Sequence, residues 1–177
     1  MKKLLFIWVE GGSDARFFDI VLKQYFEKIY QRVIVRTYAN LKRVKFEQIL
    51  LGLQAMGADF IVVADIDQER CVTSKKQYVQ TRIKGIDADR IRVVIQEIES
   101  WYLAGLDETD AGKCGIPVLD RTDTITKEQF IAMMPDQFDS RIDFMMELLK
   151  HFSCAEAVHK NNSFRYFIAK HQLRIAE

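Results

Sequence analysis

The sequence predicts an α/β fold: a parallel four-stranded sheet flanked by helices, followed by a helical extension. Between residues 4 and 95, four short apolar runs alternate with stretches of helical periodicity. This order is typical of βα units, whose right-handed crossovers produce a parallel sheet. From Ala104 the apolar runs stop and the pattern is mainly helical. We therefore expect an α/β domain over residues 1–105 and a helical extension packed on it over residues 106–177.

The composition indicates a globular chain without a strong overall charge. Of 177 residues, 49% are hydrophobic, so the chain can bury a substantial core. The 26 basic and 25 acidic residues leave a net charge of +1, which gives no bulk support for nucleic-acid binding but permits a local basic groove. Function must therefore come from individual positions.

The chain contains three cysteines, Cys71, Cys114 and Cys154, which lack Cys-x-x-Cys spacing. They therefore indicate neither a disulfide framework nor a zinc site. A reducing cytoplasm fits them best. The first residues, Met1–Val9, imitate a signal peptide, but the apolar run ends at Glu10 without a cleavage site. No run reaches the ~20 apolar residues of a membrane span, so no membrane association is expected.

The first strand, Leu4–Val9, leads into Glu10 and a glycine turn. Ser13 is a suitable N-cap for the following helix, which carries an apolar stripe near the 3.6-residue period. Gly11 and Gly12 would let backbone amides at this helix N-terminus approach an anion such as a phosphate, although the turn matches neither the P-loop nor Gly-x-Gly-x-x-Gly. Alternatively, the two glycines only form the turn.

A second strand is expected over residues 32–39, followed by a basic connector and a helix that ends at Gly57. The connector contains Lys42, Arg43 and Lys45. These side chains could contact phosphate, but a short charged loop is more often only solvated.

The run Phe60–Ala64 is typical of a central strand buried on both faces. It ends in Asp65 and Asp67, whose side chains would lie on one side of an extended chain, at the sheet edge where α/β proteins bind ligands. Two carboxylates at this spacing can share a divalent cation such as Mg²⁺. The alternative is that Asp65 caps the next helix and Asp67 is solvated.

A polar helix over residues 72–84 precedes the fourth strand, Ile91–Ile95, which leads into Glu97 and Glu99. The helix should present an exposed basic face formed by Lys75, Lys76, Arg82 and Lys84. Three of the four strands thus end on acids. Because the carboxyl ends of parallel strands meet at one edge of a sheet, the sequence predicts a metal site there, with the ligands Glu10, Asp65, Asp67, Glu97 and Glu99.

The C-terminal part begins with an irregular excursion from Asp107 to Asp123 and continues with helices at about 126–134, 139–152, 153–159 and 163–172. Ser163 is the predicted N-cap of the last helix. Three basic residues of this part could contact phosphate or could equally be surface charges: Lys127, Lys160 and Arg165.

Two of these features together resemble a known family. A strand that ends in Glu and a glycine turn (Val9–Asp14), followed by a strand that ends in Asp-x-Asp (Ala64–Asp67), resembles the TOPRIM domain, a Rossmann-like fold of primases, topoisomerases and OLD-type nucleases. The resemblance covers residues 3–105. In addition, Ile98–Leu103 and Asn162–Phe167 are similar to segments of small stand-alone TOPRIM-like proteins of prokaryotes.

The resemblance implies a phosphoryl-transfer centre that depends on Mg²⁺ or Mn²⁺. Glu10 matches the family's first-strand glutamate, a metal ligand or general acid/base, while Asp65 and Asp67 match its metal-binding pair. Glu99 matches the further acid that OLD-like nucleases use for a second metal, with Glu97 as its neighbour. The chain lacks the ATPase that accompanies OLD nucleases, so a protein partner or a homodimer is also expected.

The expected function is a metal-dependent nuclease or phosphotransferase acting on DNA or RNA, with a role in prokaryotic defence. One alternative is a non-catalytic TOPRIM-like module that holds a nucleotide, a metal or a protein partner. Another is a small-molecule phosphohydrolase. If the protein depends on a metal, its clustered carboxylates would repel one another when no cation is bound. Some of their pKa values would then rise.

Overall fold

The computed structural model describes residues 3–175 and divides into two compact units, Met1–Val94 and Ile95–Glu177. The first, here called the sheet unit, contains all the described strands, and the second, the helical unit, contains described helices without strands. The division falls directly after the last strand, whereas the sequence suggested residue 105.

Four parallel strands form the sheet in the order β2-β1-β3-β4, which confirms the predicted fold class. The inner strands β1 and β3 are apolar on both faces, as their uninterrupted hydrophobic sequences indicated. The edge strand β2 exposes Arg32 and Arg36 and ends at Thr37, earlier than expected. The strand bounds are β1 Leu4–Val9, β2 Arg32–Thr37, β3 Asp59–Asp65 and β4 Ile91–Val94.

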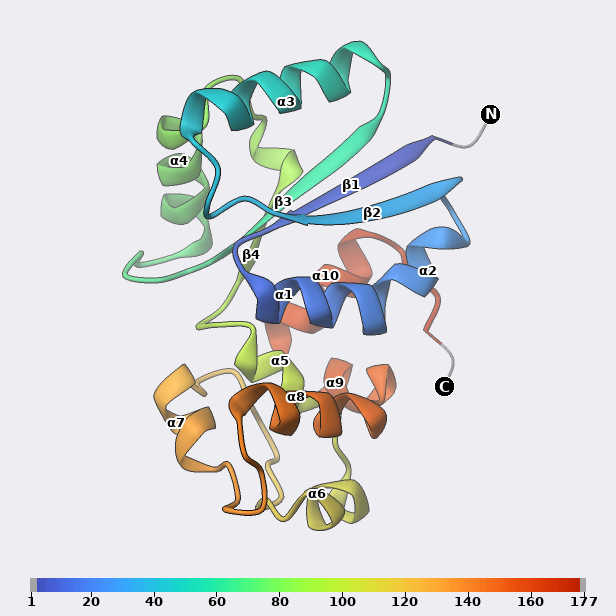
Figure 1. Ribbon diagram of the computed structural model, residues 1–177, viewed down its shortest axis with the longest axis vertical. Helices are drawn as coiled ribbons and strands as arrows, with labels where there is room; N and C mark the ends of the chain where they lie inside the picture. Colours follow the sequence, from blue (N-terminus) through green and yellow to red (C-terminus); the bar gives the residue numbers. More distant parts are fainter. Residues whose placement is uncertain (1–2, 176–177) are drawn as a thin grey trace. The chain divides into compact units, whose positions relative to one another are not determined.

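Helices cover both faces of this sheet (Figure 1). On one face lie α3 (Arg43–Ala55) and α4 (Val72–Arg82), which pack on alternate residues of the central strands, such as Trp8 and Val62. On the other lie three consecutive segments, α1 (Gly12–Phe17), the π-helical η1 (Phe18–Leu22) and α2 (Lys23–Glu27). Because side chains two residues apart in a strand point to the same face, Glu10 lies on the same face as Trp8, the face covered by α3 and α4.

The helix after the glycine turn begins earlier than predicted. Gly11 is its N-cap, and the Gly11 N–H donates to Asp14 Oδ2 at 3.0 Å. The predicted N-cap at Ser13 is therefore wrong, because the Asp14 carboxylate accepts the Gly11 N–H and the helix begins two residues earlier. The expected stop of α3 is confirmed: Gly57 follows it with φ +68°, a conformation that glycine adopts without strain.

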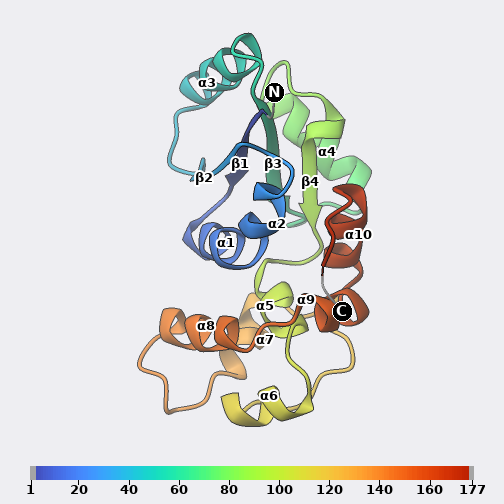
Figure 2. The same ribbon diagram turned by 90° about the vertical axis from the view of Figure 1, so that its right-hand side faces the viewer.

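Six helices make up the described part of the helical unit, and α5 lies among α7, α8 and α9 (Figure 2). Their aromatic side chains form its core, in which Trp101, Tyr102, Phe130, Phe144 and Phe164 are almost fully buried. The helix bounds are α5 Glu99–Ala104, α6 Glu108–Cys114, α7 Lys127–Ala132, α8 Arg141–Lys150, α9 Cys154–Lys160 and α10 Asn162–Lys170.

Helix α6 lies inside the stretch that was predicted to be irregular. Asp107 caps it, because the Asp107 Oδ1 atom accepts the Asp110 N–H at 2.8 Å, and Gly115 ends it with φ +74°. Asp and Gly are poor formers of helix interiors but good caps, so a short helix enclosed by them was missed. Elsewhere in the unit, a Cβ on Gly105 would stand 2.3 Å from the Phe152 ring, so this close approach requires glycine.

Among residues 3–175, no helix combines the length and the hydropathy needed to cross a membrane.

Candidate functional site

Glu10 stands half-buried immediately after β1. Its Oε1 atom accepts the Asp65 backbone N–H at 3.3 Å and lies 3.2 Å from the Tyr38 hydroxyl, which donates to it. The same hydroxyl is 3.1 Å from the Val63 carbonyl oxygen. The ends of β1 and β3 are therefore joined at the carboxyl edge of the sheet, and the structure brings the Glu10 carboxylate to the Asp65 backbone.

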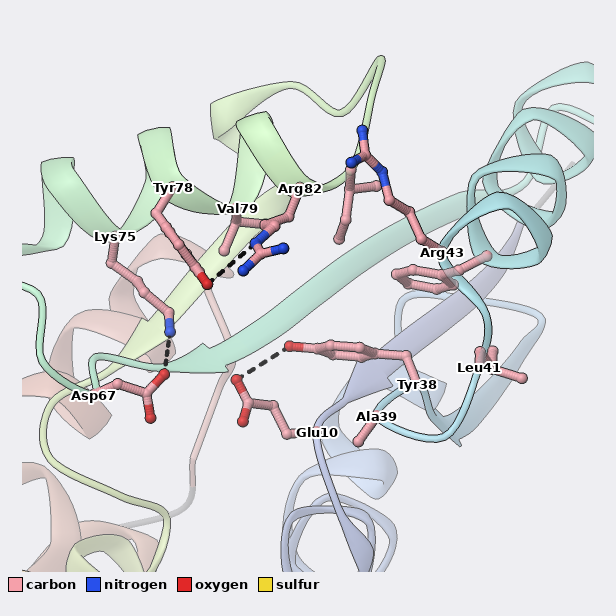
Figure 3. A pocket seen from close by; sticks show the side chains of 12 residues that line it. Glu10, Tyr38, Ala39, Leu41, Arg43, Asp67, Lys75, Tyr78, Val79 and Arg82 are labelled. Carbon is pink, nitrogen blue, oxygen red and sulfur yellow. Dashed lines mark hydrogen bonds and ion pairs between the residues drawn. The ribbon is translucent and has the colours of Figure 1, made fainter.

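Asp65 is the last residue of β3, and its Oδ1 atom is buried. The following Ile66 N–H still donates to the Val94 carbonyl at 2.9 Å, but the chain then turns at Asp67, which has φ +49°. The expected extended arrangement of Asp65 and Asp67 is therefore wrong. The turn places the Asp67 carboxylate beside Glu10 in a common pocket, with 58% of the Asp67 side chain exposed (Figure 3).

Lys75 of α4 is the main site residue that the sequence did not reveal. It was expected on an exposed basic face, but it is only 3% exposed and its Nζ atom forms an ion pair with Asp67 Oδ2 (Figure 3). A signal was present, because Lys75 lies on the stripe at helical spacing that also contains Val79 and Ile83. A lysine on the apolar stripe of a helix buries its aliphatic chain, so its ammonium group needs an acidic partner.

Burial is the largest influence on the Glu10 carboxyl and raises its pKa. The Asp67 carboxylate raises the pKa further, whereas the Lys75 ammonium lowers it. The pKa of the Tyr38 hydroxyl is raised by burial and by the neighbouring Glu10 charge. Negative charge at this site is thus incompletely compensated by Lys75, and a bound cation would lower the pKa of Glu10.

Glu10→Gln is expected to raise the unfolding temperature of the metal-free protein at pH 7 by about 2–4 °C. Folding raises the pKa of this carboxyl, so the unfolded state ionises at lower pH than the folded state. The folded protein therefore loses stability as the pH rises from the ordinary pKa of a glutamate through the folded pKa. Glutamine does not ionise. Calorimetry in EDTA should therefore show the difference at pH 7 and its disappearance below about pH 4. A lower unfolding temperature of the variant at pH 7 would contradict the account.

Glu97 and Glu99 belong to the helical unit. Glu99 is 4% exposed and accepts a hydrogen bond from Arg141 Nη1 at 3.3 Å. Burial raises the Glu99 pKa, Arg141 lowers it and Glu97 raises it. Glu97 Oε2 accepts the Lys127 N–H at 2.7 Å, at the N-terminus of α7. The structure thus groups Glu10, Asp65 and Asp67 in one unit and Glu97 and Glu99 in the other, and the convergence of both groups stays a prediction.

The glycine turn offers less than expected to an anion. The Gly11 N–H is engaged by Asp14 Oδ2, and Asp14 is 6% exposed. Neither glycine has a left-handed backbone, and a Cβ at Gly12 would meet nothing within 4 Å. Space and backbone conformation therefore do not require glycine here, and phosphate contact by Gly11 and Gly12 stays a prediction.

The oxygen donors of the sheet unit suit a hard divalent cation such as Mg²⁺ or Mn²⁺. Glu10, Asp65 and Asp67 would hold it. In the arrangement of the described side chains, no group of three or more His, Cys, Asp or Glu residues is placed to hold a metal ion, and Asp67 is paired with Lys75 instead. The exposed Asp67 carboxylate can change its rotamer, so the donor chemistry fits the cation and its binding remains a prediction.

Comparison with known proteins adds evidence on the fold. No protein-family model matches the sequence, and no curated protein matches it. Among solved structures, the chain resembles the C-terminal region of the Burkholderia pseudomallei OLD protein, with a TM-score of 0.52 and 14% identity over 96% of this chain and 98% of that one. The likeness shows the fold. Two structures of the C-terminal region of the Xanthomonas campestris pv. campestris OLD protein match with TM-scores of 0.42 and 0.43, at 18% and 17% identity, over 95% of this chain and 97% of each.

The two C-terminal motifs of the sequence meet in a buried polar network. Trp101 Nε1 donates to Ser163 Oγ at 2.7 Å, and Ser163 donates to Asn161 Oδ1 at 2.9 Å. Asn161 Oδ1 also accepts the Phe164 N–H at 3.0 Å, so Asn161 is the N-cap of α10 and the prediction of Ser163 is wrong. The Ser163 hydroxyl is engaged by Trp101 instead. These motif residues are therefore part of the packing of the helical unit.

Asn161→Ala is expected to destabilise the helical unit by about 1–2 kcal/mol, because it removes an N-cap and leaves buried donors unpaired. Asn161 is fully buried, and its Nδ2 atom also donates to Thr122 Oγ1 at 3.0 Å. Urea unfolding followed by tryptophan fluorescence provides the measurement. The neighbouring Asn162 is exposed, so Asn162→Ala is the matched control, with an expected change within about 0.5 kcal/mol. Equal effects of both variants would contradict the assignment.

Proposed function

We propose that this protein cleaves phosphodiester bonds of DNA or RNA with a divalent cation, Mg²⁺ or Mn²⁺, held by Glu10, Asp65 and Asp67. The observation that carries the proposal is the hydrogen bond from the Asp65 backbone N–H to Glu10 Oε1, which places the two acidic residues at the ends of adjacent parallel strands. Ligands of α/β proteins bind at this edge of the sheet. The resemblance of Glu10 and Asp65-Ile66-Asp67 to TOPRIM motifs and the fold shared with an OLD C-terminal region support the same function.

The chain's own residues have distinct roles in this proposal. A bound cation would neutralise charge on the phosphate and favour ionisation of a water. Glu10, whose pKa is raised by burial, is proposed to hold or accept a proton, and Tyr38 orients its carboxylate. Lys75, which forms an ion pair with Asp67, adds positive charge for a phosphate. Glu99, with Glu97, is proposed to serve a second cation.

A non-catalytic binding module is the second candidate, and one observation favours it. Lys75 already compensates Asp67 without a metal, so the site can be stable as a cation-free pocket for a nucleotide or a protein partner. The catalytic proposal also includes a homodimer or a further protein partner, and a role in defence.

Cleavage assays separate these candidates. Purified protein is incubated with plasmid, single-stranded DNA or RNA in Mn²⁺, Mg²⁺ or EDTA, and products are separated by electrophoresis. The proposal expects products that depend on the cation and disappear in EDTA. Nucleotide binding without turnover of any substrate would favour the binding module, and hydrolysis of a small phosphoester alone would favour a phosphohydrolase.

A further inference from the structure

The sheet unit contains a pocket of about 430 Å³ beside the carboxylates (Figure 3). Its volume lies in the range of small-ligand sites, about 300–1,000 Å³. One wall comes from α4 and the other from the segment that follows β2 and from the start of α3. Its charged and hydroxyl-bearing lining includes Glu10, Tyr38, Arg43, Asp67, Lys75 and Arg82.

Two arginines add positive charge to this pocket apart from Lys75. Arg82 follows Lys75 along α4, and its guanidinium lies 5.3 Å from the centre of the Tyr78 ring, with Nε donating to the Tyr78 hydroxyl at 3.2 Å. Among the described residues, no carboxylate forms an ion pair with Arg82. Arg43, on the opposite wall, is anchored through Nε to Glu47 at 3.0 Å. An anion in the pocket would therefore find guanidinium groups on both walls.

The remaining lining is aromatic and apolar. The rings of Tyr38 and Phe46 are stacked, with centroids 5.2 Å apart and an interplanar angle of 8°. Leu41, Val79 and Ile83 complete this lining. A flat ring can pack against such a wall, and stacking on aromatic side chains holds nucleobases without sequence preference. Inorganic phosphate would leave the apolar lining unused, and a purely apolar ligand would leave the arginines unused.

We propose that this pocket is a nucleotide subsite, with the base against Tyr38 and the apolar lining and a phosphate at Arg82 and Arg43. This deepens the proposed function and rests on it in one respect: the next phosphate of the strand would then lie at Glu10 and Asp67. The subsite itself needs no cation.

Calorimetric titration with deoxynucleoside 5′-monophosphates in EDTA tests the subsite apart from cleavage. Saturable binding is expected, and it should be weaker for ribose 5-phosphate, which lacks the base, and for a nucleoside, which lacks the phosphate. Arg82→Gln should lower the affinity about tenfold, as expected for a lost charge-assisted hydrogen bond. Arg32→Gln is the matched control, because Arg32 is an exposed arginine of β2 outside the pocket lining, and it should change nothing.

A second variant obstructs the pocket from its rim. Ala39 lines the pocket but is exposed, so Ala39→Trp should abolish binding with an unchanged unfolding temperature. The subsite is overturned if the wild-type protein binds no nucleotide saturably, or if Arg82→Gln and Ala39→Trp both leave the affinity unchanged. Binding with these dependences but no cleavage in Mn²⁺ would keep the subsite and remove the nuclease proposal. Cleavage without nucleotide binding would do the reverse.

Discussion

Asp65→Asn is expected to lower the rate of cation-dependent cleavage at least about 100-fold, equivalent to ~2.7 kcal/mol of transition-state stabilisation. Asparagine keeps the size of the side chain but loses the charge that a divalent cation requires of its ligands. The Asp65 N–H, which donates to Glu10 Oε1, belongs to the backbone and is retained. Single-turnover cleavage at saturating Mn²⁺ measures the change, and circular dichroism verifies that the variant is folded.

The same strand provides a matched control. Asp59 begins β3, opposite Asp65 at its end, and forms a surface ion pair with Lys3 at 3.7 Å. Asp59→Asn removes the same charge from the other edge of the sheet, so cleavage should stay within about twofold, because surface ion pairs contribute little. If Asp65→Asn also stayed within twofold of the wild type, Asp65 would not be part of a cleavage centre.

The position of Glu10 and Asp65 at adjacent strand ends could be predicted because it depends on strand order and direction alone. Both follow continuous apolar runs, and such runs in a βα alternation indicate parallel inner strands whose ends share one edge. The relation required no knowledge of side-chain conformation. The placement of Asp67 did require it, because the chain leaves the extended conformation at that residue.

Lys75 and Asn161 show why other parts of the site and fold were missed in the sequence. A lysine on a polar helix is normally solvated, and only the packing of α4 against the sheet buries Lys75 beside Asp67. Ser163 and Asn161 are both good N-caps, and the choice between them depends on Trp101, a residue distant in the chain that engages the serine. Local preferences thus yield to tertiary contacts in both cases.

Lys75 and a divalent cation would compete for the same carboxylate. The Lys75 ammonium is buried and paired with Asp67, and it also lowers the pKa of Glu10. A cation held by Glu10 and Asp67 must therefore displace this ammonium or approach it closely, and repulsion between the two positive charges weakens cation binding. Lys75→Met is accordingly expected to strengthen Mn²⁺ binding by about 10–100-fold, a change of ~1.4–2.7 kcal/mol.

Thermal unfolding at several Mn²⁺ concentrations measures this change. Without metal, Lys75→Met leaves Glu10 and Asp67 uncompensated, so its unfolding temperature at pH 7 should be lower than that of the wild type. Millimolar Mn²⁺ should then raise the unfolding temperature of Lys75→Met by more than that of the wild type. Binding to the folded state stabilises it by RT ln(1 + [Mn²⁺]/Kd), which is larger for the protein with the lower Kd. Lys45 is an exposed lysine of α3, and Lys45→Met should respond to Mn²⁺ like the wild type.

Each other outcome has a definite meaning. A Mn²⁺ response that disappears in Lys75→Met would show that the lysine positions Asp67 for the cation, because loss of a competitor cannot weaken binding. If Mn²⁺ stabilised neither protein at millimolar concentration, the three acids of the sheet unit would not form a cation site. Glu10 would then be a half-buried acid whose charge is only partly offset by Lys75, and the nucleotide pocket beside it would have to act without metal.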